Sequence, residues 1–361
     1  MNLKLAVAIL ASILLVGSVK NSFAQSPNEE MLEGEIVEVN SEMREAGNGE
    51  EFLYQLLTID VTRGSLSGET IEVVNDTVSL SATMEYEVGD RVVVLFSEYD
   101  GNEIFYITDY VRRDGLLILF AVFVGLAIAI GGKWGASSLI GMAISFLIIF
   151  KFILPQILAG RDAVLIAILG SAVIIPVTFS LSHGIKTKTW IASVGTVVTL
   201  IITGLIAVLF AEVVHLTGFA TEEASFLQFE LAGRVNMKGL LLAGMIIASL
   251  GILDDITISQ ASIVAELRSA NKKLNATELF RRAMNVGRDH IASLINTLVL
   301  VYTGASLPLL LLFINNPSPF AEVINLELVA DEIVRTLVGS IGLILAVPIT
   351  TAIAVYYYSK N

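Results

Sequence analysis

The chain has 361 residues, of which 55% are hydrophobic, and its mean hydropathy of +0.77 is well above that of a soluble globular chain. We therefore expect an integral membrane protein whose first partner is the lipid bilayer. The absence of cysteine excludes disulfides and thiolate metal sites, and the formal net charge of −13 argues against nucleic acid as a partner.

Residues 1–24 are predicted to be a secretory signal peptide. Lys4 supplies a positive start, Leu5–Val16 is an apolar run too short for a comfortable membrane span, and Ser22-Phe23-Ala24 has the small-x-small pattern of a cleavage site. An uncleaved anchor is the alternative. In either case the chain from Gln25 onward is expected to begin outside the cytoplasm.

The segment 25–112 is predicted to be an acidic, extracytoplasmic β domain. Between Glu29 and Asp109 lie 20 of the 35 acidic residues and three basic ones. Runs of β-branched and aromatic residues with a period of two alternate with turn signals. Five strands in about 80 residues fit a small OB-like barrel. They are expected at Leu32–Val39, Phe52–Val61, Thr70–Val74, Arg91–Phe96 and Ile104–Val111.

The acidic character of this domain also limits what it can bind. An OB fold that binds nucleic acid needs a basic groove with aromatic platforms, which this segment lacks. A structural or protein-docking role is therefore expected. Attraction of divalent cations to Glu33, Glu35 and Glu38 is the alternative.

Residues 113–361 are predicted to form a bundle of seven transmembrane helices, so the fold class is a mainly α membrane protein with a small β domain in front. With that domain outside, the odd-numbered spans run inward and the C-terminus is cytoplasmic. Basic residues such as Lys186 and Arg281 then fall on inner loops and acidic ones such as Glu222 and Glu327 on outer loops, as the positive-inside rule requires for a plasma-membrane protein. The apolar segments of spanning length are Gly115–Gly131, Trp134–Leu158, Ala163–Leu181, Trp190–Ala211, Gly239–Ser259, Ile291–Phe313 and Ile333–Tyr357.

Two connections are expected to be structured. Asn275 is placed to cap a helix with Glu278 at its third position, and Leu274 and Leu279 are placed as a hydrophobic staple, so an amphipathic helix is predicted from Ala276 to about Arg288 along the inner membrane face. On the outer side, a second helix is predicted from Phe320 to Arg335, leading into the last span.

The adjacent carboxylates Asp254 and Asp255 are the main candidate functional residues. They lie about 24–26 Å along the fifth span, which is the inner third of a bilayer core of about 30 Å. An ionisable residue at such a depth is by default a functional-site hypothesis. Asp255, Ser259, Ser262 and Glu266 share one face of the helix, and they are predicted to form a polar stripe.

The sixth span is expected to supply partners to the aspartates. It runs antiparallel to the fifth, which places Asn296 and Thr297 at about the same depth, with Asp289 and His290 at the inner boundary. The predicted centre binds a proton or a small cation through Asp254, Asp255, Ser259, Asn296 and Thr297.

Several alternatives remain open for these residues. The aspartate pair can instead cap the end of the fifth span at the interface, Glu266 can be an ordinary interfacial residue, and His290 can be an interfacial anchor rather than a proton group. Pro348 with Thr350, and Pro176 with Thr178, are candidates for a pathway, because each couples a kink to a hydroxyl group.

No catalytic triad, phosphate-binding loop or zinc motif occurs, and the three histidines lie in different loops or spans. We therefore expect neither an enzyme nor a cofactor or metal centre. An intramembrane aspartyl hydrolase would need two carboxylates on facing helices, whereas Asp254 and Asp255 are neighbours on one helix.

The membrane part resembles the YibE/F family of bacterial membrane proteins. The resemblance rests on Leu250-Gly251-Ile252-Leu253-Asp254-Asp255, Gly287-Arg288-Asp289-His290, Asn296-Thr297-Leu298, Ala305-Ser306-Leu307-Pro308 and Val347-Pro348-Ile349-Thr350-Thr351. It implies a multi-pass membrane protein and, as the usual guess, a transport role. Residues 251–304 are also similar to helices of the SecD/SecF and RND-type permeases, in which an intramembrane Asp belongs to a proton relay; this implies that role for Asp254 or Asp255.

Together these observations predict a proton- or cation-coupled secondary transporter of an unknown small solute or ion, with a homodimer or a second membrane subunit as a possible partner. The alternative is a non-transporting assembly or signalling component, in which the β domain docks a partner and the aspartate pair is structural.

Overall fold

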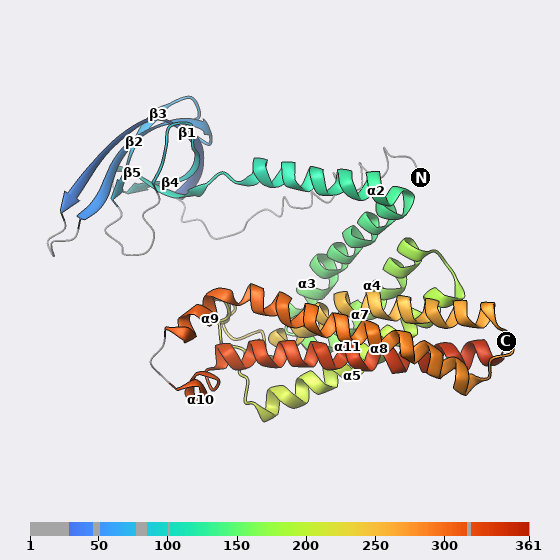
Figure 1. Cartoon of the computed structure of the whole chain (residues 1–361). Coiled ribbons are helices and arrows are strands. Elements are labelled where there is room, and N and C mark those ends of the chain that lie inside the picture. The colour runs from blue at the N-terminus through green and yellow to red at the C-terminus, as the bar shows by residue number, and fades with distance from the viewer. Residues whose placement is uncertain (1–28, 46–50, 77–84, 100–101, 316–318, 361) are drawn as a thin grey trace. The chain divides into compact units, whose positions relative to one another are not determined.

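A computed structural model describes residues 29–45, 51–76, 85–99, 102–315 and 319–360 of the chain (Figure 1). They form two compact units, which divide between residues 126 and 127. The expected signal peptide, residues 1–24, lies outside the described residues, so it stays a prediction.

The first unit contains a five-stranded antiparallel sheet with the strand order β3-β2-β1-β4-β5. The five expected strand positions are confirmed. The two edge strands approach each other, so the sheet is strongly curled, but no closed OB-like barrel is confirmed. The strands are β1 Glu29–Glu45, β2 Glu51–Arg63, β3 Thr70–Asp76, β4 Arg91–Tyr99 and β5 Asn102–Tyr110.

The alternation of apolar and polar residues along the strands explains how this sheet forms a hydrophobic core. Alternate side chains on each strand point to the same face, and those on the concave face are apolar. Ile36 on β1, Ile59 on β2 and Val94 on β4 are fully buried in one cluster. The opposite face carries the acidic residues, which explains why a domain with so many carboxylates can still fold.

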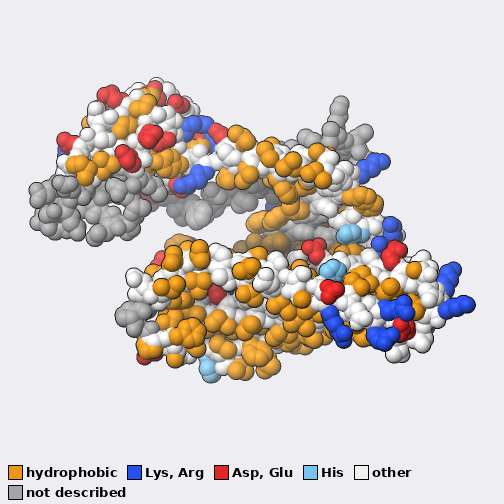
Figure 2. All heavy atoms as spheres, in the orientation of Figure 1, with side chains coloured by type: hydrophobic (Ala, Val, Ile, Leu, Met, Phe, Trp, Pro, Cys, Tyr) orange, Lys and Arg blue, Asp and Glu red, His pale blue; other side chains and the backbone are white. Residues whose placement is uncertain are grey.

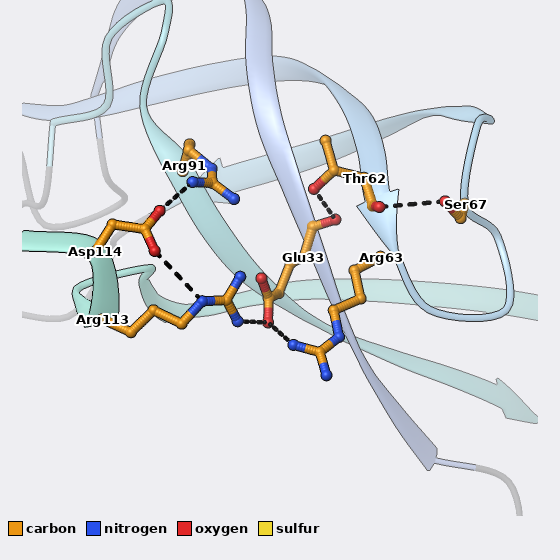
Figure 3. A network of polar contacts seen from close by, with 7 residues as sticks. All are labelled: Glu33, Thr62, Arg63, Ser67, Arg91, Arg113 and Asp114. Carbon is orange, nitrogen blue, oxygen red and sulfur yellow. Dashed lines mark hydrogen bonds and ion pairs between the residues drawn. The ribbon is translucent and has the colours of Figure 1, made fainter. Parts of the chain in front are cut away.

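A network of charged side chains joins β1 to the start of helix α2 (Arg113–Ile148). The Glu33 carboxylate accepts from Arg113 at 2.7 Å and lies 3.4 Å from Arg63. Asp114, the next residue on the helix, pairs with Arg91 on β4 (Figure 3). Three strands therefore contribute charged residues that hold the first turn of α2.

Replacing Glu33 with Ala is expected to loosen this junction, because it leaves two guanidinium groups without their carboxylate. For such partly exposed pairs we expect a loss of about 1 kcal/mol and faster hydrogen–deuterium exchange in β1 and in the first turn of α2. Glu35→Ala is the matched control, since Glu35 lies on the same strand and is exposed. Equal exchange in the two variants would contradict the role given to Glu33.

The second unit is helical. Its elements are the continuation of α2, the π-helix η1 (Ile149–Ile153), α3 (Leu154–Leu158), α4 (Ala163–His183), α5 (Thr187–Val213), α6 (Glu222–Glu230), α7 (Met237–Ala270), α8 (Ala276–Ala305), α9 (Leu307–Ile314), α10 (Phe320–Val323) and α11 (Glu327–Lys360). Figure 2 shows apolar side chains over much of its outer surface. Leu205, Leu209 and Leu337 are among the large apolar side chains that are exposed. Such a surface fits the hydrocarbon of a bilayer.

The expected count of seven spans is not confirmed. Within the described residues five helices are long and apolar enough to cross a membrane, or six if α8 and α9, which are bent by 71° to each other, form one broken span. The first two expected spans lie in the continuous run Arg113–Leu158. Its backbone breaks at Gly132, whose φ of 55° and ψ of −131° are not helical.

The helices α5, α7 and α11 pack against one another, with α4 beside α5 and α7, and α8 beside α7 and α11 (Figure 1). Helix α5 is antiparallel to α7, because Glu212 pairs with Lys238 at one end and Thr196 meets Thr257 nearer the other. Most of the buried apolar residues of these helices form one large cluster, and a second, smaller cluster joins α5, α7 and α11 around Ala207, Leu242 and Val338.

Close packing of α5 on α11 depends on Gly342. A Cβ added there would lie 2.4 Å from the Thr203 hydroxyl oxygen and 3.3 Å from the Thr203 Cβ, so rotation of the threonine cannot remove the clash. Gly342→Ala is expected to destabilise the helical unit by about 1–3 kcal/mol, although alanine is the better helix former. The measurement is thermal unfolding of the purified full chain in detergent. Gly244→Ala on α7 is the control, because that position faces open space; the same loss in both variants would refute the packing argument.

The expected inner and outer connections are each partly confirmed. The Asn275 side chain accepts a hydrogen bond from the Glu278 amide at 2.8 Å, as predicted, but the amphipathic segment continues without a break into the sixth span as α8. The expected outer helix from Phe320 is divided into α10 and the start of α11. Helix α6 was not predicted.

Candidate functional site

The two aspartates of α7 have different surroundings. Asp254 is half-buried, and its Oδ1 is buried with no hydrogen-bond partner among the described residues. Asp255 is exposed and lies close enough to His183, at the end of α4, for the two charges to interact. Because neighbours on a helix point about 100° apart, only one of two adjacent aspartates can face the bundle. Here it is Asp254.

The polar stripe expected from Asp255 does not face the helix bundle. Asp255 and Glu266 are exposed, and Ser259 and Ser262 are half-buried. The buried polar residues of α7 lie on the adjacent face and are Ser249, Thr257 and Gln260.

A buried polar cluster lies next to Asp254, at the contact of α5, α7, α8 and α11. Thr257, one turn beyond Asp254, has its hydroxyl 2.7 Å from that of Thr196 on α5. Gln260 donates from Nε2 to the Thr351 hydroxyl on α11 at 2.7 Å and to the Ala283 carbonyl on α8 at 3.0 Å. The side chains of this cluster are fully buried.

Gly195 on α5 packs closely against the Thr350 side chain on α11 in this cluster. A Cβ on Gly195 would lie 2.5 Å from the Thr350 Oγ1, so the threonine occupies space that only glycine leaves. The Thr350 hydroxyl is buried without a partner in the described structure. Pro348 lies two residues before Thr350 in α11, which remains helical through the proline.

Helix α5 carries a row of buried hydroxyl groups toward the same cluster. Four of them donate to the carbonyl four residues back, as Thr199 does to Gly195 at 2.8 Å, and Thr189 donates to the Gly184 carbonyl just before the helix, so their lone pairs remain free to accept. At 1.5 Å per residue the row is about 21 Å long. Its members are Thr189, Ser193, Thr196, Thr199 and Thr203.

His290 on α8 also has an unused polar atom. Its Nδ1 is buried and has no partner among the described residues. Gln260 lies between Ala283 and Gly287 of α8, and α8 folds back along α7. Along α8, His290 lies about 5–10 Å beyond those two residues, and along α7, Asp254 lies about 9 Å before Gln260. Because α8 runs antiparallel to α7, both distances extend in the same direction. The register therefore places His290 at the height of Asp254.

The other expected partners on α8 lie elsewhere. Asn296 and Thr297 are exposed, and the Thr297 hydroxyl donates to the Ser293 carbonyl at 3.0 Å. No hydrogen bond joins either of them to Asp254 or Asp255 in the part of the chain that the structure describes. Asp289 is exposed as well.

Charged groups gather in one region of the surface of the helical unit. Figure 2 shows acidic and histidine side chains close together there, beside a group of Lys and Arg. Among the described residues no three His, Asp or Glu side chains converge as metal ligands do. A small cation at this centre would have one carboxylate, that of Asp254, and hydroxyl oxygens as its ligands.

Comparison with known proteins gives one match. A family model described as YibE/F-like protein matches residues 119–360, which includes all of the centre described above. No curated protein and no solved structure matches the chain. The expected similarity of residues 251–304 to SecD/SecF and RND-type permeases is not shown.

Proposed function

The chain belongs to the YibE/F-like family, and on the geometry of its helical unit we propose that it is a proton- or cation-coupled transporter, with Asp254 as the group that binds the coupling ion. The apolar helices and the family match make it a membrane protein. The transport activity and the role of Asp254 are the proposal.

One observation carries it: the Asp254 carboxylate has a buried oxygen with no hydrogen-bond donor among the described residues. An unpaired buried carboxylate is costly, and binding of a proton or a cation offsets that cost. Gln260 Oε1 and Thr350 Oγ1 are also buried without a partner among the described residues, but unlike the Asp254 carboxylate neither carries a negative charge that a proton or a cation can neutralise. We therefore assign the Asp254 carboxylate as the group that accepts the ion.

The surroundings provide a route to and from this group. In the proposed orientation, the end of α7 with Asp255, and of α4 with His183, faces the cytoplasm. A proton can pass from water at the exposed Asp255 to Asp254, because the two residues are adjacent. On the other side, the Thr257 and Thr196 hydroxyls and the row on α5 offer acceptors along the packed interface.

His290 is the second proton acceptor in this scheme. A proton that leaves Asp254 can be taken up by the free Nδ1 of His290 at the same height, so that the charge moves between α7 and α8. The close packing of α5, α7 and α11 blocks a continuous water path, so release to the outer side requires the helices to move. Alternating exposure of Asp254 to the two sides is the step that would couple the ion to a solute.

Reconstituted vesicles test this function. Full-length protein in lipid vesicles is expected to speed the decay of an imposed proton or sodium gradient, compared with protein-free vesicles, as followed with an internal pH- or sodium-sensitive dye. Decay at the protein-free rate for both ions would contradict the proposal.

A further inference from the structure

A second cluster of charged residues lies near the N-terminal end of α11, whereas Thr350 and Thr351 lie toward the other end of this helix. The Arg335 guanidinium donates to the Asp331 carboxylate at 2.9 Å and lies 3.5 Å from that of Glu332. Two carboxylates and one guanidinium leave the cluster with one net negative charge. Asp331 is only 4% exposed, although ionisable side chains are rarely so buried.

The pairing within this cluster is incomplete. Asp331 Oδ1 and Arg335 Nε are both buried with no hydrogen-bond partner among the described residues. An unpaired acceptor on a nearly buried carboxylate disfavours the empty state of the site. A ligand that donates a hydrogen bond to Asp331 would remove this cost.

Two cavities meet at this cluster. The smaller, of about 410 Å³, is lined by Asp331, Arg335, Glu223 and Tyr302 together with apolar residues of α6 and α7. The larger, of about 710 Å³, lies between α8, α9, α10 and α11. Tyr302 lines both cavities and lies within electrostatic reach of Arg335 and Glu332. The charged cluster therefore contributes residues to both cavities, and Tyr302 is a lining residue that they share.

The larger cavity is apolar apart from a few hydroxyl groups and one charge. Glu332 is the only ionisable group among its lining residues apart from Tyr302, and none of them is basic. The 71° bend between α8 and α9, at Ser306 and Pro308, opens the space. Its volume is in the range that holds small organic ligands.

We propose that this site binds an amphipathic organic cation, with its ammonium group at Asp331 and Glu332 and its apolar part in the larger cavity. The net negative charge selects a cation over an anion, and the free Oδ1 of Asp331 accepts an N–H bond from the ammonium group. The apolar lining favours a hydrocarbon chain over a hydrated metal ion. The claim that such a cation is also the transported substrate rests on the proposed function. The claim that it binds at this site does not.

Three probes of equal chain length test the site: octylammonium, octanol and octanoate. Binding to the purified full chain in lipid nanodiscs is measured by titration calorimetry. Octylammonium is expected to bind roughly tenfold or more tightly than octanol, and octanoate more weakly than both. Asp331→Asn and Glu332→Gln are each expected to remove most of the preference for octylammonium, while Glu322→Gln, on α10 and outside the cavity lining, leaves it unchanged.

Two results would overturn the inference. Equal affinity for the three probes would mean that the larger cavity takes any acyl chain, as bilayer lipid would supply. A preference for octylammonium that survives in both Asp331→Asn and Glu332→Gln would place the cation elsewhere. The Asp254→Asn variant separates this test from that of the proposed function, because it is expected to bind octylammonium as the wild type does whether or not it transports ions.

Discussion

Vesicles that contain the Asp254→Asn variant are expected to lose the protein-dependent decay of a proton gradient. Asparagine has nearly the same shape as aspartate but neither binds a proton nor carries a negative charge, so it should fill the same half-buried position without serving as an ion site. Groups that transfer protons typically contribute about 10²- to 10⁴-fold to a rate, and we expect a loss of at least about 10²-fold here. The measurement is the initial rate of internal pH change at equal protein content.

The matched control is Asp255→Asn on the adjacent residue. Asp255 is exposed and faces His183, so its loss removes a charge at the entrance but leaves the buried carboxylate in place. We expect this variant to keep most of the rate. Wild-type rates in Asp254→Asn, with the variant correctly inserted, would show that the buried carboxylate is structural. Loss of the rate in Asp255→Asn but not in Asp254→Asn would make Asp255 the ion-binding group.

The second large effect is expected on stability, from Gln260→Ala. The glutamine is fully buried, fills space between α7, α8 and α11, and donates two hydrogen bonds. Its truncation leaves a cavity and removes both bonds, so we expect a loss of about 2–4 kcal/mol. Gln260→Leu restores most of the volume but not the bonds, and it should fall between Gln260→Ala and the wild type.

Denaturant or thermal unfolding of the purified chain measures this effect, with Glu266→Ala as the control. Glu266 lies on the same helix and is exposed, so its change should stay within about 0.5 kcal/mol. If Gln260→Ala were no less stable than Glu266→Ala, the buried polar cluster would not hold the three helices together.

The local patterns in the sequence predicted much of the fold. The strands were found because alternation of side chains and turn residues are properties of a short stretch of chain. The cap at Asn275 was found for the same reason, since its bond to the Glu278 amide spans three residues. The closure of the sheet and the number of spans were not settled, because they depend on contacts between distant segments and on the single backbone angle at Gly132.

For the candidate site, too, the sequence predicted local features but not the contacts between helices. Asp254 was found from its position in an apolar run, but the choice between Asp254 and Asp255 depends on how α7 is rotated against α5 and α11. Depth alone suggested Asn296 as a partner, yet the side chain lies on the outer face of α8. The rotation and register of two packed helices follow from side-chain contacts across the interface, which a single sequence does not provide.

The threonines of α5 were missed for a different reason. Threonine and serine scattered in a long apolar helix give little contrast in hydropathy, and all of these residues except Thr189 satisfy their own donor within the helix. Their spacing of three or four residues from Thr189 to Thr203 was the available signal. It would have indicated one polar face directed toward the neighbouring helices.

Infrared spectroscopy of the full chain in lipid, recorded while the surrounding pH is changed, tests the central claim most directly. The account predicts that one component of the pH-dependent carboxylic-acid C=O signal, present in the wild type and in Asp255→Asn, is missing from Asp254→Asn. A pH-dependent band of the same intensity in Asp254→Asn would show that Asp254 does not exchange a proton. Together with unchanged sodium binding in that variant, it would contradict the assignment of this residue as the coupling site.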